Sequence, residues 1–126
     1  MRSARRFSNS PTSVTQARRY VQEHLDGAPS DVADAVAIMT SELATNSIRH
    51  AATDFEVAVD RSDRRIRVDV TDRGPGTPVV LAAEPTAVSG RGMHIVSQLA
   101  DDWGVTASGT GDAKTVWFTV TLPYKS

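Results

Sequence analysis

The sequence predicts an α+β domain, a two-layer sandwich in which about three helices cover a mixed, mostly antiparallel sheet. Helical patterns dominate residues 12–52, and alternating strand patterns dominate the second half of the chain. Two of the strand patterns follow each other across a short turn, as in an antiparallel hairpin. A chain of 126 residues has the length of one domain, so we expect a single domain over residues 1–126.

The composition is that of an ordinary globular domain, with 40% hydrophobic and 23% charged residues. The 14 Lys and Arg nearly cancel the 15 Asp and Glu, so the charge does not favour direct nucleic-acid binding. The absence of cysteine excludes disulfides and thiolate chemistry, and fits a reducing, cytoplasmic location. The chain starts with basic residues but no apolar run follows them, so we expect neither a signal peptide nor a membrane span.

The first half of the chain predicts an arm and two helices. Residues 1–11 are polar and basic, and we expect them to form an N-terminal arm with a short strand over 5–8. A first helix begins after Pro11, where a Thr-Ser pair offers a cap, and apolar residues recur at helical spacing through Leu25. A stop rich in glycine and proline then separates it from a longer helix, expected from about residue 31 to 52.

The second half predicts four strands and one more helix. Apolar and polar residues alternate over 55–60 and 65–71, which predicts two strands joined by a tight turn. A loop rich in glycine and proline follows, and a third helix begins at Gly90. Residues 103–107 and 114–122 predict two further strands that complete the sheet.

Glu42 and Asn46 lie four residues apart on the second predicted helix and therefore share a face, and His50 continues the row. An amide oxygen suits a hard cation such as Mg²⁺ bound to phosphates. A glutamate can deprotonate a hydroxyl that attacks a phosphate. The alternative is a surface pair that stabilises the helix end, with His50 as an ordinary packing histidine; spacing alone favours this alternative.

Asp72 has the same strand parity as Val68 and Val70, so it points into the apolar layer if the strand extends that far. A carboxylate in that layer needs a donor, and the amino group of a purine is one candidate. The alternative is an aspartate that ends the strand and folds into a turn with Gly74.

The glycines permit two further ligand contacts. Gly74 and Gly76 allow a tight backbone beside a ligand, and they equally suit a plain turn. Gly90, Arg91 and Gly92 begin a helix, where backbone N–H groups attract phosphate and Arg91 adds a charge-assisted contact. The alternative is a loop-to-helix junction with an exposed arginine. The sequence has neither a Walker loop nor the dinucleotide-binding fingerprint, and no serine has the surroundings of a hydrolase nucleophile.

The order of these segments carries a resemblance to the GHKL ATPase superfamily, the group of gyrase, Hsp90, histidine kinases and MutL. Four segments resemble its boxes in order: the N box (41–51), the G1 box (70–76), the G2 box (89–96) and the closing strand (112–118). The resemblance extends from the first helix to Leu122. Within the superfamily, the sequence is most similar to the small bacterial anti-sigma factor serine/threonine kinases.

This resemblance implies the Bergerat type of two-layer sandwich, with ATP and Mg²⁺ as cofactors. It also implies a homodimer whose partners are an anti-anti-sigma (STAS) protein and a sigma factor. Glu42 is implied as the general base that activates a serine of the STAS partner, Asn46 as the Mg²⁺ ligand, and Asp72 as the acceptor of a hydrogen bond from the adenine amino group. The other implied ATP-binding residues are His50, Gly74, Gly76, Gly90, Arg91, Gly92, Met93 and Thr115.

Two features of the boxes leave alternatives open. The lid segment, residues 78–89, is short and poor in glycine. Thr115 has the opposite parity to Val116 and Phe118, so a strictly alternating strand turns it away from the core unless a bulge or a late strand start intervenes. A non-catalytic, ATP-dependent binding switch and a detached GHKL ATPase domain are therefore the alternatives to a kinase.

Overall fold

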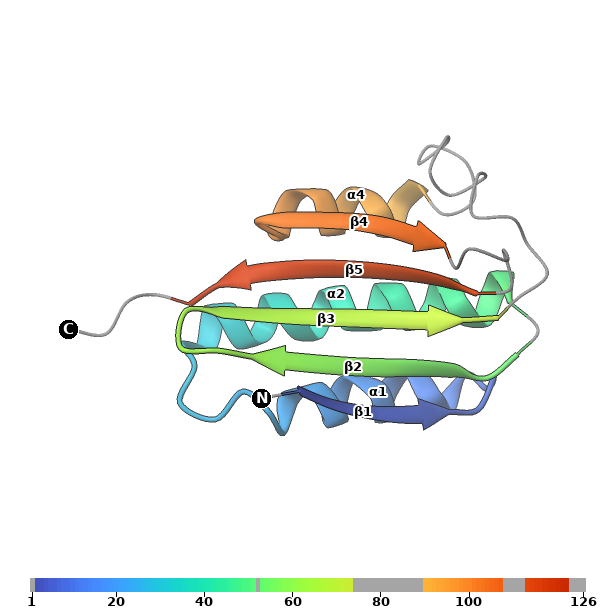
Figure 1. Ribbon diagram of the computed structural model, residues 1–126, viewed down its shortest axis with the longest axis horizontal. Coiled ribbons are helices and arrows are strands. Elements are labelled where there is room, and N and C mark those ends of the chain that lie inside the picture. The colour runs from blue at the N-terminus through green and yellow to red at the C-terminus, as the bar shows by residue number, and fades with distance from the viewer. Residues whose placement is uncertain (1, 52, 74–89, 108–112, 123–126) are drawn as a thin grey trace.

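The computed structural model describes residues 2–51, 53–73, 90–107 and 113–122, which form a five-stranded sheet and a layer of helices (Figure 1). The elements are, in order, β1 (Arg2–Phe7), α1 (Thr12–Gln22), α2 (Ser30–His50), β2 (Phe55–Arg61), β3 (Arg65–Asp72), α4 (Gly90–Leu99), β4 (Asp102–Ala107) and β5 (Lys114–Thr121). The three described helices lie on the same face of the sheet. This arrangement confirms the predicted α+β two-layer fold.

The strands lie in the order β1-β2-β3-β5-β4, and every neighbouring pair is antiparallel. The described sheet is therefore antiparallel throughout, whereas the sequence analysis expected a mixed, mostly antiparallel one. Because β5 lies between β3 and β4, the last strand of the chain is an interior strand. Its first residue, Lys114, pairs with Asp72 at the end of β3.

The core lies between the inner face of the sheet and the helices, because every second side chain along a strand points toward the helices. The fully buried residues on the inner face include Val57, Val59, Ile66, Val68 and Phe118. They belong to one hydrophobic cluster with Val21 of α1, Val36, Met39 and Leu43 of α2, and Val96 of α4. Each helix thus contributes its apolar stripe to a single core.

Residues 2–7 form the edge strand β1, which corrects the expectation of an arm with a short strand over 5–8. β1 pairs with β2 along its whole length, and the rings of Phe7 and Phe55 stack with their centroids 5.6 Å apart. The hydroxyl groups of Ser3 and Tyr20 share a hydrogen bond, which fastens α1 to this strand. Sheet pairing and aromatic packing therefore order a segment whose composition is polar.

The long helix α2 ends at His50, two residues before the predicted end. Ala51 has extended backbone angles, φ −116° and ψ 146°. The side-chain amide of Asn9 stabilises the segment that follows the helix, because its Nδ2 donates hydrogen bonds to the carbonyl oxygens of Ala51 at 2.7 Å and Thr53 at 3.1 Å. Asn9 thus fixes the end of the helix that carries the candidate site residues.

Candidate functional site

Asp72 and the last turns of α2 lie together at one end of the molecule. The end of α2, the end of β3 and the start of β5 meet there, and α4 begins at the same end (Figure 1). Asp72 lies on the inner face and is 2% exposed, so it points toward the helices as its parity predicted. Ser47 of α2 donates a hydrogen bond from Oγ to Oδ2 of Asp72 at 2.9 Å. This bond fixes the carboxylate against the helix.

Lys114 is the second charged group at this end. Its Nζ lies 3.6 Å from Oδ1 of Asp72, and its side chain is 7% exposed. The ammonium supplies the counter-charge that a buried carboxylate needs. Lys114 is not among the residues predicted for the site, although its parity with Val116 and Phe118 was a signal that it lies on the inner face.

Glu42 and Asn46 are half-buried on α2, where Asn46 directly precedes Ser47 and Glu42 lies one turn before Asn46. Among the described residues, neither side chain has a hydrogen-bond or ion-pair partner. Glu42 also borders a shallow groove of about 440 Å³ between α1 and α2, together with Arg18, Asp34, Ala37, Ile38 and Ser41. The carboxylate thus lies between the polar end of α2 and an outer groove.

His50, the last residue of the row, is half-buried. Burial lowers its pKa below the usual value for histidine, and the positive charges of Lys114 and Arg49 lower the pKa further. The charge of Asp72 acts in the opposite direction with a smaller effect. The neutral imidazole is therefore favoured at neutral pH, which leaves one ring nitrogen as an acceptor.

Thr115 lies on the outer face of the sheet, as a strictly alternating strand predicts, and its contact with the nucleotide stays a prediction. Its Oγ1 shares a hydrogen bond of 2.7 Å with Oγ1 of Thr71, its partner on β3. β5 alternates regularly through this pair, so no bulge turns Thr115 inward. The inner-face position beside Asp72 belongs to Lys114 instead.

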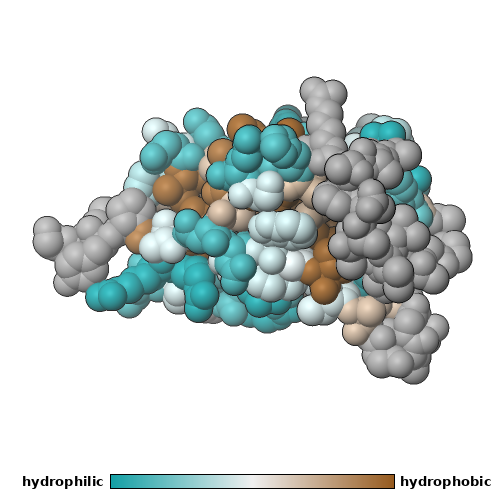
Figure 2. Space-filling model, turned by 90° about the horizontal axis from the view of Figure 1, so that it is seen from above, coloured by the Kyte–Doolittle hydropathy of each residue, from teal (hydrophilic) through white to brown (hydrophobic). Residues whose placement is uncertain are grey.

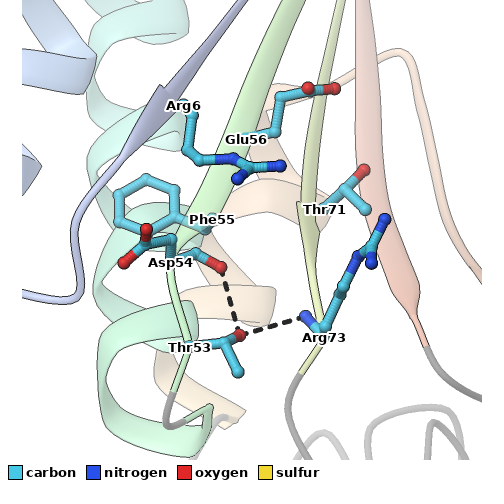
Figure 3. A pocket seen from close by; sticks show the side chains of 7 residues that line it. All are labelled: Arg6, Thr53, Asp54, Phe55, Glu56, Thr71 and Arg73. Carbon is cyan, nitrogen blue, oxygen red and sulfur yellow. Dashed lines mark hydrogen bonds between the residues drawn. The ribbon is translucent and has the colours of Figure 1, made fainter.

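A separate hollow of about 310 Å³ lies on the outer face (Figure 3). Side chains from β1, β2 and β3 line it, and they carry charges of both signs. The lining residues are Arg6, Thr53, Asp54, Phe55, Glu56, Thr71 and Arg73. The backbone N–H of Arg73 donates to Oγ1 of Thr53 at 3.2 Å, which joins the two strand ends below the hollow. Because Asp72 points to the inner face, this hollow is distinct from the site at the end of α2.

The glycine segments are described only in part. Gly74 and Gly76 lie outside the described residues, as does the lid segment 78–89. Gly90 to Gly92 begin α4, as predicted, and their backbone is helical. Met93 is 3% exposed and belongs to the hydrophobic core, so its side chain packs under α4.

Among the described residues, no three His, Asp or Glu side chains lie close enough together to hold a metal ion. A cation at this end would therefore take most of its ligands from a bound phosphate chain and water, as Mg²⁺ does in nucleotide sites. The half-buried amide of Asn46 supplies the kind of hard oxygen ligand that such a site needs. The amide of Asn46 therefore fits a Mg²⁺ ion that arrives with a nucleotide.

The edge formed by β4 and α4 is part of the exposed surface (Figure 2). Figure 2 looks onto the edge formed by β4 and α4, where hydrophobic residues are scattered among hydrophilic ones over the described part of the surface. In the part of the chain that the structure describes, no helix is long and apolar enough to cross a membrane.

The two-layer fold, with three described helices on one face of an antiparallel sheet, is consistent with a GHKL-type domain. A protein-family model described as "Histidine kinase-like ATPase domain" matches residues 7–120. The chain belongs to the histidine kinase-like ATPase domain family. The resemblance of its ordered boxes to the GHKL superfamily is thereby confirmed.

A solved structure with the same fold is described as the crystal structure of the RsbU and RsbW domains of Rv1364c from Mycobacterium tuberculosis. The TM-score is 0.73 at 16% sequence identity, and the match covers 98% of this chain and 34% of the other. The chain therefore spans about a third of that protein's solved length. At this identity the likeness shows the fold. No curated protein sequence matches the chain.

Proposed function

We propose that this protein is an ATP- and Mg²⁺-dependent protein serine kinase that acts as an anti-sigma factor. Its substrate is a serine of an anti-anti-sigma (STAS) protein, and its other partner is a sigma factor. The observation that carries the proposal is the row on α2: Glu42 and Asn46 are half-buried without partners among the described residues, on the helix whose Ser47 binds the Asp72 carboxylate. Family membership makes ATP the nucleotide expected at this end.

Different side chains bind different parts of the nucleotide. Asp72 accepts a hydrogen bond from the 6-amino group of adenine, which gives its buried carboxylate a further donor beside Ser47. Asn46 supplies one oxygen ligand to Mg²⁺, which shields the negative charge of the phosphates when bound. His50, Gly74, Gly76 and the start of α4 at Gly90–Gly92 line the rest of the nucleotide.

Glu42 supplies the base for transfer. The hydroxyl oxygen of the substrate serine forms a bond to the γ-phosphorus of ATP, the bond from that phosphorus to the bridging oxygen of ADP breaks, and ADP leaves. The hydroxyl proton goes to the carboxylate of Glu42. The position of Glu42 at the border of the α1–α2 groove is open to a protein substrate.

The proposal is tested with Glu42→Gln, a change that keeps size and removes the base. We expect ATP affinity to remain and transfer of labelled γ-phosphate to a STAS protein to fall about 100-fold or more. Glu56→Gln is the matched control, because Glu56 is an exposed glutamate on the outer face of the sheet. Wild-type protein that binds ATP but transfers no phosphate to a serine would end the kinase proposal.

A second candidate is a non-catalytic, ATP-dependent binding switch. Ile38 favours it, because this large apolar residue is 48% exposed in the same groove as Glu42 and Arg18. For a switch, Glu42→Gln changes no measurable activity, whereas Ile38→Asp weakens capture of the partner in the presence of ATP. A kinase gives the opposite result for Glu42→Gln in the transfer assay.

Location and assembly follow from the same proposal. A kinase that meets sigma factors and ATP acts in the cytoplasm. A homodimer is part of the proposal, and sedimentation equilibrium measures it directly. A monomer at all accessible concentrations would remove the dimer without affecting the nucleotide site.

A further inference from the structure

Lys114 is a lysine in a place where lysines are rare, the inner face of an interior strand. It has the same parity as Val116 and Phe118, and its side chain is 7% exposed. The resemblance to the GHKL boxes implied Thr115 as the residue near the adenine. The strand register puts Lys114 at the position beside Asp72 instead.

The ammonium of Lys114 has hydrogen-bonding capacity to spare. The 3.6 Å between Nζ and Oδ1 exceeds the roughly 2.7–2.9 Å of a charge-assisted hydrogen bond. The attraction is therefore electrostatic, and the two atoms do not saturate each other. An ammonium has three N–H donors, and at this distance from Oδ1 they stay available to a further acceptor; the neighbouring carboxylate, which accepts a bond from Ser47 on Oδ2, has about four acceptor positions in all. The pair thus presents an acceptor and a donor side by side.

We propose that Lys114 contacts the base of the bound nucleotide and selects adenine, donating a hydrogen bond to ring nitrogen N1 while Asp72 accepts one from the 6-amino group. The inference rests on the proposed function, which places adenine at Asp72. Adenine carries a donor, its 6-amino group, next to an acceptor, N1. This order is complementary to the acceptor and donor that Asp72 and Lys114 present.

Guanine and hypoxanthine carry the opposite order, with the acceptor O6 next to the donor N1–H. In the same position, O6 faces the carboxylate of Asp72 and N1–H faces the ammonium of Lys114. Two buried polar groups then lose their partners, which is the strongest way for a site to reject a close analogue. We expect GTP and ITP to bind at least about 100-fold more weakly than ATP.

The test compares ATP with 1-deaza-ATP, in which N1 is replaced by a C–H group that cannot accept a hydrogen bond. Titration calorimetry with Mg²⁺ present measures both ligands. For the wild type we expect 1-deaza-ATP to bind about 10- to 100-fold more weakly, the effect of one charge-assisted hydrogen bond. For Lys114→Met, which keeps the length and apolar stem, we expect weaker ATP binding and equal affinity for the two ligands.

Each outcome decides the inference. Equal affinity of the wild type for ATP and 1-deaza-ATP overturns it while leaving the proposed function intact. Discrimination that persists in Lys114→Met also overturns it. If the wild type binds no ATP, the inference and the proposed function fall together. Should Lys114→Met not fold, Lys114→Gln supplies the second variant, and the wild-type comparison of the two ligands remains decisive.

Discussion

The buried ion pair between Asp72 and Lys114 makes a prediction that needs no ligand. Asp72→Asn keeps the shape of the side chain and its bond from Ser47, but leaves the ammonium of Lys114 without a counter-charge. At 3.6 Å, Coulomb's law with an effective dielectric constant of about 20 gives about 4.6 kcal/mol for the pair. Loss of one member of a buried pair costs about 3–5 kcal/mol, and because a lysine can turn its ammonium toward water we expect about 3 kcal/mol.

Urea unfolding followed by circular dichroism measures this loss. With a slope of about 1–3 kcal/mol per molar urea, the midpoint of Asp72→Asn should fall by about 1–3 M. Asp69→Asn is the control, because Asp69 lies on the same strand and pairs with Arg67, but on the outer face where an ion pair contributes at most about 1 kcal/mol. Adding Lys114→Met to Asp72→Asn should recover most of the loss. The reasoning is refuted if Asp72→Asn loses no more stability than Asp69→Asn.

Three further predictions concern other parts of the fold. A methyl group at Gly104 would lie 2.8 Å from the ring of Trp117. Gly104→Ala should therefore destabilise the fold by about 1–3 kcal/mol and change the tryptophan fluorescence. An unchanged fluorescence spectrum and an unchanged urea midpoint would contradict this. Asn9→Ala removes two bonds to the exit of α2, so we expect a loss of about 1–3 kcal/mol and faster amide exchange near Phe55, against unchanged exchange in β5. Burial lowers the pKa of His50, so the unfolded chain binds more protons than the folded protein, and the free energy of unfolding falls as the pH drops through about 6.5. The urea midpoint of His50→Gln should therefore fall less than that of the wild type over the same pH window.

Strand alternation predicted the core and the direction of Asp72, because both depend on a local pattern of period two. The same pattern puts Lys114 on the inner face, whereas the resemblance to the closing strand of the superfamily implied Thr115. Register therefore identifies the residue beside Asp72 more reliably than residue type does, since a neighbouring residue in a strand points to the opposite face.

Other features depend on contacts between distant segments and have no local signal. The bond from Ser47 to Asp72 joins residues 25 positions apart and exists because α2 packs across β3. The length of β1 follows from its pairing with β2, since its own residues are mostly polar and exposed. The end of α2 at His50 depends on Asn9, a residue 42 positions before the carbonyl group that it binds.

The central claim is that the polar end of α2 binds ATP through Mg²⁺ at Asn46. Calorimetric titration of ATP with Mg²⁺ and with a chelator, on the wild type and Asn46→Ala, tests this claim most directly. The account predicts that Mg²⁺ strengthens ATP binding to the wild type and that Asn46→Ala loses this dependence while remaining folded. Binding to Asn46→Ala with the full Mg²⁺ dependence, or no binding of ATP to the wild type, would contradict it.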